Sequence, residues 1–163
     1  MEMPLFIVSG CSGSGKSTTA DEVGKIMRDY AVFDMDIIVN QNNFQEACNN
    51  WVRIALSLSF SGHSTILFGH IPEPYNIHIC DYIHCFDRIY YLHLHCDKAE
   101  QTERLIARGG VWTSELIQHE IGVADLLLNK AQNSNPPIPV VNTSKLNVHK
   151  VAVEIKKWVL RCS

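Results

Sequence analysis

A run of nine residues, GCSGSGKST at positions 10–18, has the composition and spacing of a phosphate-binding loop. Gly10, Gly15, Lys16 and Ser17 satisfy the Walker A pattern G-x-x-x-x-G-K-[ST]. Glycines allow positive φ angles, so backbone N–H groups can turn inward around an anion. The run follows an apolar segment and opens an amphipathic one. A helix that begins near Lys16 would direct the positive end of its dipole at the same anion.

This loop predicts a site for a nucleoside triphosphate. Lys16 can reach the β- and γ-phosphates, and the hydroxyl of Ser17 can ligate Mg²⁺. We therefore expect ATP and Mg²⁺ as the cofactors. The loop residues predicted to hold the nucleotide are Gly10, Ser12, Gly13, Ser14, Gly15, Lys16, Ser17 and Thr18.

Two aspartates that follow the second apolar run are the candidate carboxylates of this site. Asp34 and Asp36, in FDMDII, lie at the carboxyl end of a strand expected over 31–36, where open α/β sheets place their sites. Residues two apart in a strand point to the same side, so both carboxylates can face the crevice. We expect Asp34 in the shell of Mg²⁺ and Asp36 as the base that accepts a hydroxyl proton. The alternative is that one of them only caps the next turn.

Arg104 and Arg108, in ERLIARGG, are four residues apart and share one face of a helix at its C-terminal end. Beside a glycine pair, two guanidinium groups suit a mobile lid, over about 104–114, that stabilises charge on a transferring phosphoryl group. Taken alone, such a pair would only be favourable partners of the helix dipole. We assign Lys16, Asp36, Arg104 and Arg108 as the catalytic residues.

Two other classes of P-loop protein lack their markers in this sequence. A GTPase would need the guanine-reading sequence N-K-x-D, and the nearest candidate, NKAQ at 129–132, has no aspartate. An ATPase motor would place Asp or Asp-Glu at the end of the third strand, where this chain has Gly69 and His70. A nucleotide-binding regulator or slow NTPase without an acceptor stays as an alternative.

The elements that must position these residues alternate along the chain. Short apolar runs separated by longer helical patterns predict an α/β fold, a parallel sheet with helices on both faces, in one domain over 1–163. The region 71–87 is ambiguous, with a short helix expected near 75–84. The predicted strands are 5–9, 31–36, 64–69, 88–96 and 140–144, and the predicted helices are 16–30, 43–60, 97–110, 113–131 and 147–160.

The order of glycine loop, D-x-D, R-x-x-x-R and a final strand VVNTS resembles the small-molecule kinases of the P-loop superfamily. Shikimate, gluconate and adenylylsulfate kinases and the nucleoside and nucleotide kinases belong there. The resemblance spans nearly the whole chain, although only the glycine loop is highly specific. It implies a three-layer αβα fold, a five-stranded parallel sheet in the order 2-3-1-4-5, and transfer of the γ-phosphoryl group of ATP to an acceptor.

The resemblance also carries roles to single positions. Lys16 and Ser17 match the nucleotide and metal residues, and Asp34 or Asp36 matches the D-x-D. Arg104 and Arg108 match the lid arginines. The segment NTSK at 142–145 matches the loop that borders the adenine, which adds Asn142 and Thr143 to the nucleotide site.

The acceptor is expected in the segment about 37–62, which contains many amides. Arg53, the one cation between Asp36 and Gly69, either contacts the acceptor or is simply solvated, and we assign it to the acceptor site; Trp51 points elsewhere and is assigned to the core. A D-x-D pair favours a hydroxyl acceptor, because an alcohol needs a base. We predict a sugar acid or polyol, with a nucleoside or nucleotide as the alternative and a nucleic-acid end as a remote third. The substrate residues expected are Asp34, Asp36, Arg53 and His70.

A cluster of histidines and cysteines over 78–96 raises a zinc hypothesis for an accessory protein. In the strand YYLHLHC, His93 and His95 share one face and Cys96 takes the other, whereas a zinc site needs converging ligands. Buried cysteines and polar-face histidines explain the same letters, and we expect no disulfide.

Charge and hydropathy set the remaining expectations. The net charge is -3 and no long basic run is present, so no nucleic-acid partner is expected. The first residues lack a signal-peptide pattern, and the apolar run from Leu5 to Val8 is too short to cross a membrane. We therefore expect a cytoplasmic protein; the sequence does not indicate its oligomeric state.

Overall fold

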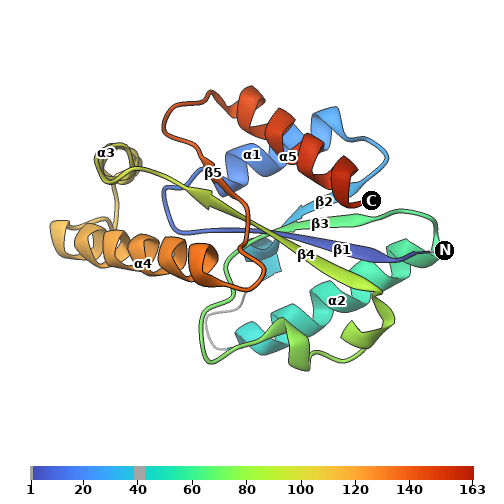
Figure 1. Cartoon of the computed structure of the whole chain (residues 1–163). Coiled ribbons are helices and arrows are strands. Elements are labelled where there is room, and N and C mark those ends of the chain that lie inside the picture. The colour runs from blue at the N-terminus through green and yellow to red at the C-terminus, as the bar shows by residue number, and fades with distance from the viewer. Residues whose placement is uncertain (1, 39–42) are drawn as a thin grey trace.

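The sheet has five parallel strands in the order β2-β3-β1-β4-β5, as predicted (Figure 1). The structure is a computed structural model and describes residues 2–38 and 43–163. The central strand is buried on both faces, which explains its unbroken apolar run. The strands are β1 (Pro4–Gly10), β2 (Ala31–Asp34), β3 (Thr65–Phe68), β4 (Arg88–His95) and β5 (Val140–Asn142).

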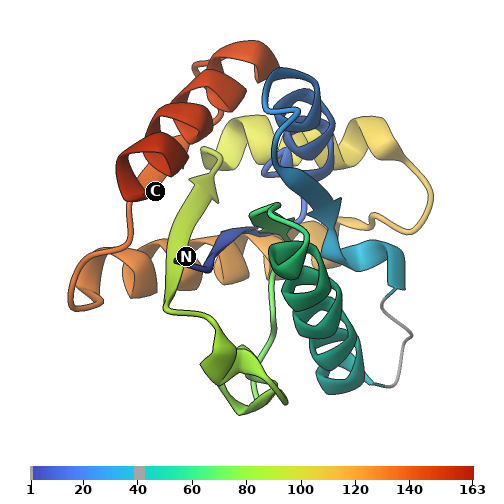
Figure 2. The same cartoon turned by 90° about the vertical axis from the view of Figure 1, so that its right-hand side faces the viewer.

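Helices cover both faces of the sheet and give the predicted three-layer αβα fold. α1 and α5 lie on one face, α2 and α4 lie on the other, and α3 lies beyond one end of the sheet (Figures 1 and 2). None of the helices in the described residues has an apolar stretch that could cross a bilayer. The helices are α1 (Lys16–Ile26), α2 (Phe44–Phe60), α3 (Lys98–Arg108), α4 (Ser114–Asn133) and α5 (Val148–Cys162).

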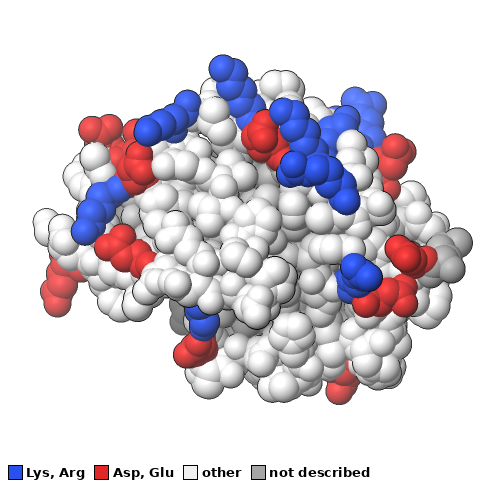
Figure 3. All heavy atoms as spheres, in the orientation of Figure 1, with Lys and Arg blue, Asp and Glu red and all other residues white. Residues whose placement is uncertain are grey.

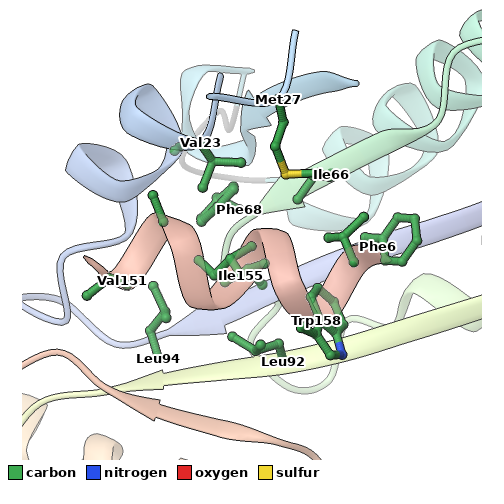
Figure 4. Packing of buried hydrophobic residues seen from close by; sticks show 14 residues of the cluster. Phe6, Val23, Met27, Ile66, Phe68, Leu92, Leu94, Val151, Ile155 and Trp158 are labelled. Atoms are coloured by element: carbon green, nitrogen blue, oxygen red, sulfur yellow. The ribbon is translucent and has the colours of Figure 1, made fainter. Parts of the chain in front are cut away.

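A hydrophobic cluster fixes α1 and α5 to the sheet (Figure 4). Ile155 and Trp158 of α5 are buried among residues of β1, β3 and β4, and Val23 of α1 closes the same cluster. On the opposite face, Trp51 of α2 is buried and its Nε1 donates to the carbonyl of Met35 at 3.0 Å. The prediction that Trp51 belongs to the core is therefore confirmed.

Two boundaries differ from the sequence prediction in ways that matter for the site. β2 ends at Asp34 instead of residue 36, because a 3-10 helix, Met35–Ile38, follows it and its amide at Asp36 donates to Asp34 Oδ1 at 3.0 Å. The predicted helix near 75–84 is replaced by two 3-10 turns, Ile77–Ile79 and Ile83–Cys85. Residues 39–42 of the predicted acceptor segment lie outside the described residues.

On the face seen in Figure 3, lysines and arginines gather along the α5 edge, with acidic side chains among them. The middle of that face carries little charge. The charge on this face therefore does not indicate a binding site. The geometry of the loops at the edge of the sheet does.

Candidate active site

The glycine loop connects the end of β1 at Gly10 to the start of α1 at Lys16. Gly13 and Gly15 have φ angles of 83° and 91°, in the left-handed region where a side chain is strained. A Cβ at Gly10 would lie 2.5 Å from Ser14 Oγ, so the turn leaves no space for one. The glycine pattern is therefore required by the backbone itself.

The start of α1 has the features of an anion site. Its N-cap residue, Gly15, offers no side-chain cap, and the first turn holds no acidic residue. The buried hydroxyl of Ser14 has no hydrogen-bond partner within residues 2–38 and 43–163. Unpaired N–H groups and an orphaned hydroxyl at a helix N-terminus fit a bound phosphate.

Lys16 lies within this loop, where its Nζ donates to the carbonyl of Cys11 at 3.0 Å. Burial lowers its pKa below the usual range, and the negative charges of Asp36 and Asp34 oppose that shift. The lysine and both predicted aspartates are thus brought into one electrostatic environment.

Ser17 and Asp34, the two predicted metal residues, are in direct contact. The Ser17 hydroxyl donates to Asp34 Oδ2 at 2.5 Å. A hydroxyl oxygen beside a carboxylate oxygen is a hard donor set that suits Mg²⁺, whose other ligands are commonly water and phosphate oxygens. No group of three or more His, Cys, Asp or Glu in the described residues could hold a metal by itself. Ser17 and Asp34 therefore fit a Mg²⁺ that arrives with a nucleotide.

The backbone element that positions Asp36 differs from the one predicted from the sequence. It lies in the 3-10 helix after β2, so the argument that both aspartates share a strand face was wrong. Asp34 accepts from this turn through its Oδ1, but it also contacts Ser17 through its Oδ2, so its role is not capping alone as the alternative interpretation held. Burial raises the pKa of Asp36, an effect that the charge of Lys16 opposes and the charge of Asp34 reinforces. The carboxylate of Asp36 is consequently a stronger base than that of an exposed aspartate.

A cavity of about 370 Å³ lies beside the loop, between α3, α1 and the start of α5. Loop residues and Thr143 line it on one side, and Leu146, Val148 and Val151 line it on the other. A slot with one polar edge and one apolar wall suits a purine base that enters beside its phosphates.

Arg104 lines this cavity as a fixed residue, which differs from the mobile lid position predicted for it. Its Nε donates to Glu100 at 2.8 Å. Its Nη1 donates to the Gly13 carbonyl at 3.2 Å and to Thr143 Oγ1 at 3.1 Å, and its Nη2 donates to the Thr143 carbonyl at 3.2 Å. The guanidinium therefore joins α3 to the glycine loop and to the loop after β5.

Arg108 occupies a different environment on the same helix. It is exposed and lines the same cavity, and its side chain makes no hydrogen bond or ion pair with any described residue. Its charge contributes to lowering the pKa of Lys16, so the two cations lie close enough to interact. Of the two arginines, Arg108 has the freedom that the predicted lid role needs.

Some of the remaining predicted residues line a cavity, and others position a loop or lie elsewhere. Thr143 lines the cavity, whereas the Asn142 amide donates to Asp97 Oδ1 at 2.8 Å and so positions the loop. His70 lines a second cavity, of about 320 Å³, together with residues of β1, β4 and α4. Arg53 pairs with Asp81 at 3.3 Å on the exposed side of α2 and is not among the residues that line either cavity.

Two residues that support the loop were missed by the sequence analysis. Gln101 is fully buried, and its amide donates to the Ser12 carbonyl at 2.9 Å. Glu120 of α4 accepts from the Ser12 amide at 3.3 Å. Gln101 shares the helix face of buried Leu105, four residues on, which is a signal that could have indicated a buried position. Glu120 carries a similar signal, because buried Ile117 and Ala124 lie three residues before it and four residues after it on α4.

The histidine and cysteine cluster does not converge on a metal within the described residues. All six cysteines are free thiols. His93 is 2% exposed, so it is a buried histidine and not the polar-face residue expected from the strand pattern.

The contrast between the two arginines gives a prediction about stability. Arg104→Ala should lower the free energy of unfolding by about 2–3 kcal/mol, because hydrogen bonds from a charged donor are lost and their buried acceptors stay unpaired. In a domain of this size the melting temperature should fall by roughly 4–12 °C. Arg108→Ala is the matched control and should change stability by about 0.5 kcal/mol or less. Thermal unfolding without nucleotide measures both, and equal shifts would contradict the fixed position of Arg104.

No family model matches this sequence, and no curated protein matches it. Solved structures do match nearly its whole length. An unliganded sugar kinase from Janibacter sp. HTCC2649 has a TM-score of 0.67 at 16% identity, over 98% of this chain and 95% of that chain. A gluconokinase from Sinorhizobium meliloti 1021 has a TM-score of 0.61 at 15% identity, over 99% and 95%. An uncharacterized protein from Eubacterium ventriosum ATCC 27560 has a TM-score of 0.62 at 12% identity, over 97% and 98%.

At these identities the likeness shows the fold. The chain has the three-layer αβα fold of P-loop kinases, with the five-stranded sheet in the predicted order. The function has to be argued from the residues of the site.

Proposed function

We propose that this protein is an ATP-dependent phosphotransferase that moves the γ-phosphoryl group to a hydroxyl of a small molecule. The observation that carries the proposal is the position of Asp36. Its amide donates to Asp34, the carboxylate that accepts from Ser17 of the phosphate loop, and the charges of Lys16 and His70 affect its pKa. A carboxyl group beside the phosphate loop is available as the base for an acceptor hydroxyl.

ATP would supply the phosphoryl group, and Ser17 and Asp34 would hold a Mg²⁺ that supplies positive charge to the phosphate oxygens. The glycine loop binds the phosphates through its N–H groups, and Lys16 donates to the oxygens on which charge develops. Asp36 accepts the proton of the acceptor hydroxyl. As the acceptor oxygen bonds to phosphorus, the bond from phosphorus to the bridging oxygen of ADP breaks, so proton and phosphoryl group are both accounted for.

The similar structures support the same reaction class. Two of the three described above are kinases, one a sugar kinase and one a gluconokinase. They favour a small-molecule acceptor over a regulator that only binds nucleotide. The acceptor type predicted from the sequence, a sugar acid or polyol, is part of this proposal to be tested.

The test has a binding step and a transfer step. A non-hydrolysable ATP analogue with Mg²⁺ should stabilise the protein by about 2.7 kcal/mol at one hundred times its Kd, measured as a rise in melting temperature. ADP release from ATP should then be slow alone and rise when one compound of an acceptor panel is added. Failure of the analogue to stabilise would refute the nucleotide site. Stabilisation with acceptor-independent ADP release would favour the regulator or slow NTPase.

A further inference from the structure

The second cavity lies against the sheet face that α2 and α4 cover. Two of its lining residues adjoin the candidate active site. Ser9 directly precedes Gly10, the first glycine of the phosphate loop. Gly69 packs so closely on Met35 that a Cβ added at Gly69 would lie 2.7 Å from Met35 Cβ, and the residue after Met35 is Asp36. The cavity therefore borders both the phosphate loop and the turn that carries Asp36.

One wall of the cavity, residues 75–78, is held in place by α2. The Gln45 side chain forms two hydrogen bonds with the backbone of Asn76: its Nε2 donates to the carbonyl and its Oε1 accepts from the amide, each at 2.9 Å. Phe44 stacks on Tyr75, with the ring centroids 5.3 Å apart. The wall is therefore formed before a ligand arrives, as is usual for sites that bind small molecules.

Hydrogen-bonding side chains surround the cavity on several sides. Eight of the fifteen lining residues carry one, and apolar side chains lie between them. The polar lining residues include Ser9 of β1, Asn76 and His78 of the wall, Tyr91 and His93 of β4, and Lys130 of α4. A ligand whose hydroxyl groups point in several directions can pair with groups distributed in this way, whereas a planar ring carries polar atoms only along its edge.

His93 contributes a buried atom that lacks a partner. The residue is 2% exposed, its Nδ1 lies 3.0 Å from Ser9 Oγ, and its Nε2 has no hydrogen-bond partner within residues 2–38 and 43–163. Buried polar atoms in native proteins are usually paired with protein, water or ligand. A hydroxyl group both donates and accepts, so it can pair with this nitrogen in either tautomer of His93. Because His93 lines the cavity, a ligand hydroxyl in the cavity is in place to supply the partner.

We infer that the second cavity binds the acceptor, and that the acceptor is a small compound with several hydroxyl groups. One hydroxyl pairs with His93 Nε2, and the hydroxyl that receives the phosphoryl group lies at the end of the cavity bordered by Ser9 and Gly69. Polyols and sugar acids share this chemistry. α2 then serves the acceptor by holding the wall at 75–78 and not through Arg53, which pairs elsewhere. The inference rests on the proposed phosphotransferase function and adds the place where the acceptor binds.

Binding without nucleotide tests the cavity separately from transfer. Saturation-transfer NMR with sorbitol, xylitol, gluconate, uridine and 3-hydroxymethylpyridine should show binding of at least one of the first three compounds and of neither ring compound. The two polyols against gluconate distinguish an uncharged from an acidic acceptor. Binding of either ring compound, or of no compound at all, would overturn the inference.

Two variants test whether the bound compound occupies this cavity. His93→Leu should weaken its binding by about tenfold, because a hydrogen bond to the ligand is lost, and His93→Gln should restore part of it. Exposed His84→Leu is the matched control. Leu127→Trp fills the cavity from α4 and should abolish binding even if His93→Leu does not fold. Its control is Leu126→Trp, because Leu126 is 70% exposed and does not line this cavity.

The transfer assay separates failure of this inference from failure of the proposed function. Phosphoryl transfer to a polyol or to gluconate that persists in Leu127→Trp would overturn the inference and leave the phosphotransferase intact. Binding of a hydroxylated compound that never raises ADP release from ATP would refute the proposed function and leave the cavity as a binding site. Binding that is unchanged in both His93→Leu and Leu127→Trp would refute the cavity as its site.

Discussion

Lys16→Met is expected to reduce the rate of phosphoryl transfer at saturating ATP by about 10²–10³-fold, because it removes a positive charge that acts on the transferring group. Met keeps most of the length of the lysine stem, so the loop should keep its packing. The native ammonium is held on the Cys11 carbonyl in a buried position that disfavours its charge. The melting temperature without nucleotide should therefore stay the same or rise.

The control for this variant is Lys25→Met. Lys25 lies on the same helix, is exposed, and pairs with Glu22 three residues away. It should transfer phosphoryl groups at the native rate. A single-turnover assay with both variants checks the prediction, and a native rate in Lys16→Met would remove the basis for the nucleotide site as described here.

Asp36→Asn is expected to lower the transfer rate by about 10²–10⁴-fold while sparing binding of the ATP analogue, because only the step that takes up the acceptor proton is lost. The native rate should fall as the pH falls through the pKa of Asp36, since the protonated carboxyl cannot act as a base. Burial raises that pKa, so the acid limb should lie above the range of an ordinary aspartate. The limb should disappear in the variant.

The stability of Asp36→Asn provides a second, independent test of the role of this residue. A raised pKa means that folding favours the protonated carboxyl, so its contribution to stability is present at low pH and is lost as the pH rises through the folded pKa. Asn cannot ionise, and Asp36→Asn should be at least as stable as the native protein at pH 7. Exposed Asp21→Asn should change neither rate nor stability. A marked loss of stability in Asp36→Asn would show that the carboxylate has a structural role instead.

The glycine loop could be predicted because it rests on local signals, whereas the sheet order was implied by the resemblance to the small-molecule kinases. Strand β1 is an uninterrupted apolar run, and the glycine spacing that follows it is dictated by φ angles within six residues. The contact of Ser17 with Asp34 is consistent with the same fold, because the carboxyl ends of parallel strands lie at one edge of the sheet, although β3 separates β2 from β1.

The placement of Arg104 could not be predicted from the sequence. Its helix face was correct, but its acceptors lie on Gly13 and Thr143, which are 91 and 39 residues away along the chain. Nothing in the spacing of two arginines distinguishes a guanidinium held by distant carbonyls from one that is free. Arg108, with the same residue type on the same face, has the opposite environment.

The second cavity was hidden for a similar reason. The helix expected near 75–84 is interrupted at the extended Cys80 and at Tyr82, which adopts a φ of 66°, and the turn before Cys80 brings His78 to Tyr91 of β4. The alternation of YYLHLHC suggested solvent for His93, whereas α4 and these turns bury it. Burial of a polar strand face depends on which segments cover it, and that is a tertiary property.

The hydrogen bonds of Arg104 have a thermodynamic consequence for ligand binding. By fastening the Gly13 carbonyl to Thr143, the guanidinium makes the phosphate loop and the neighbouring slot parts of one rigid frame. The entropy of ordering that frame is lost once, when the chain folds, and is not lost again when a nucleotide arrives. The site is pre-organised, so less of the free energy of its contacts with the nucleotide is offset by ordering of the protein.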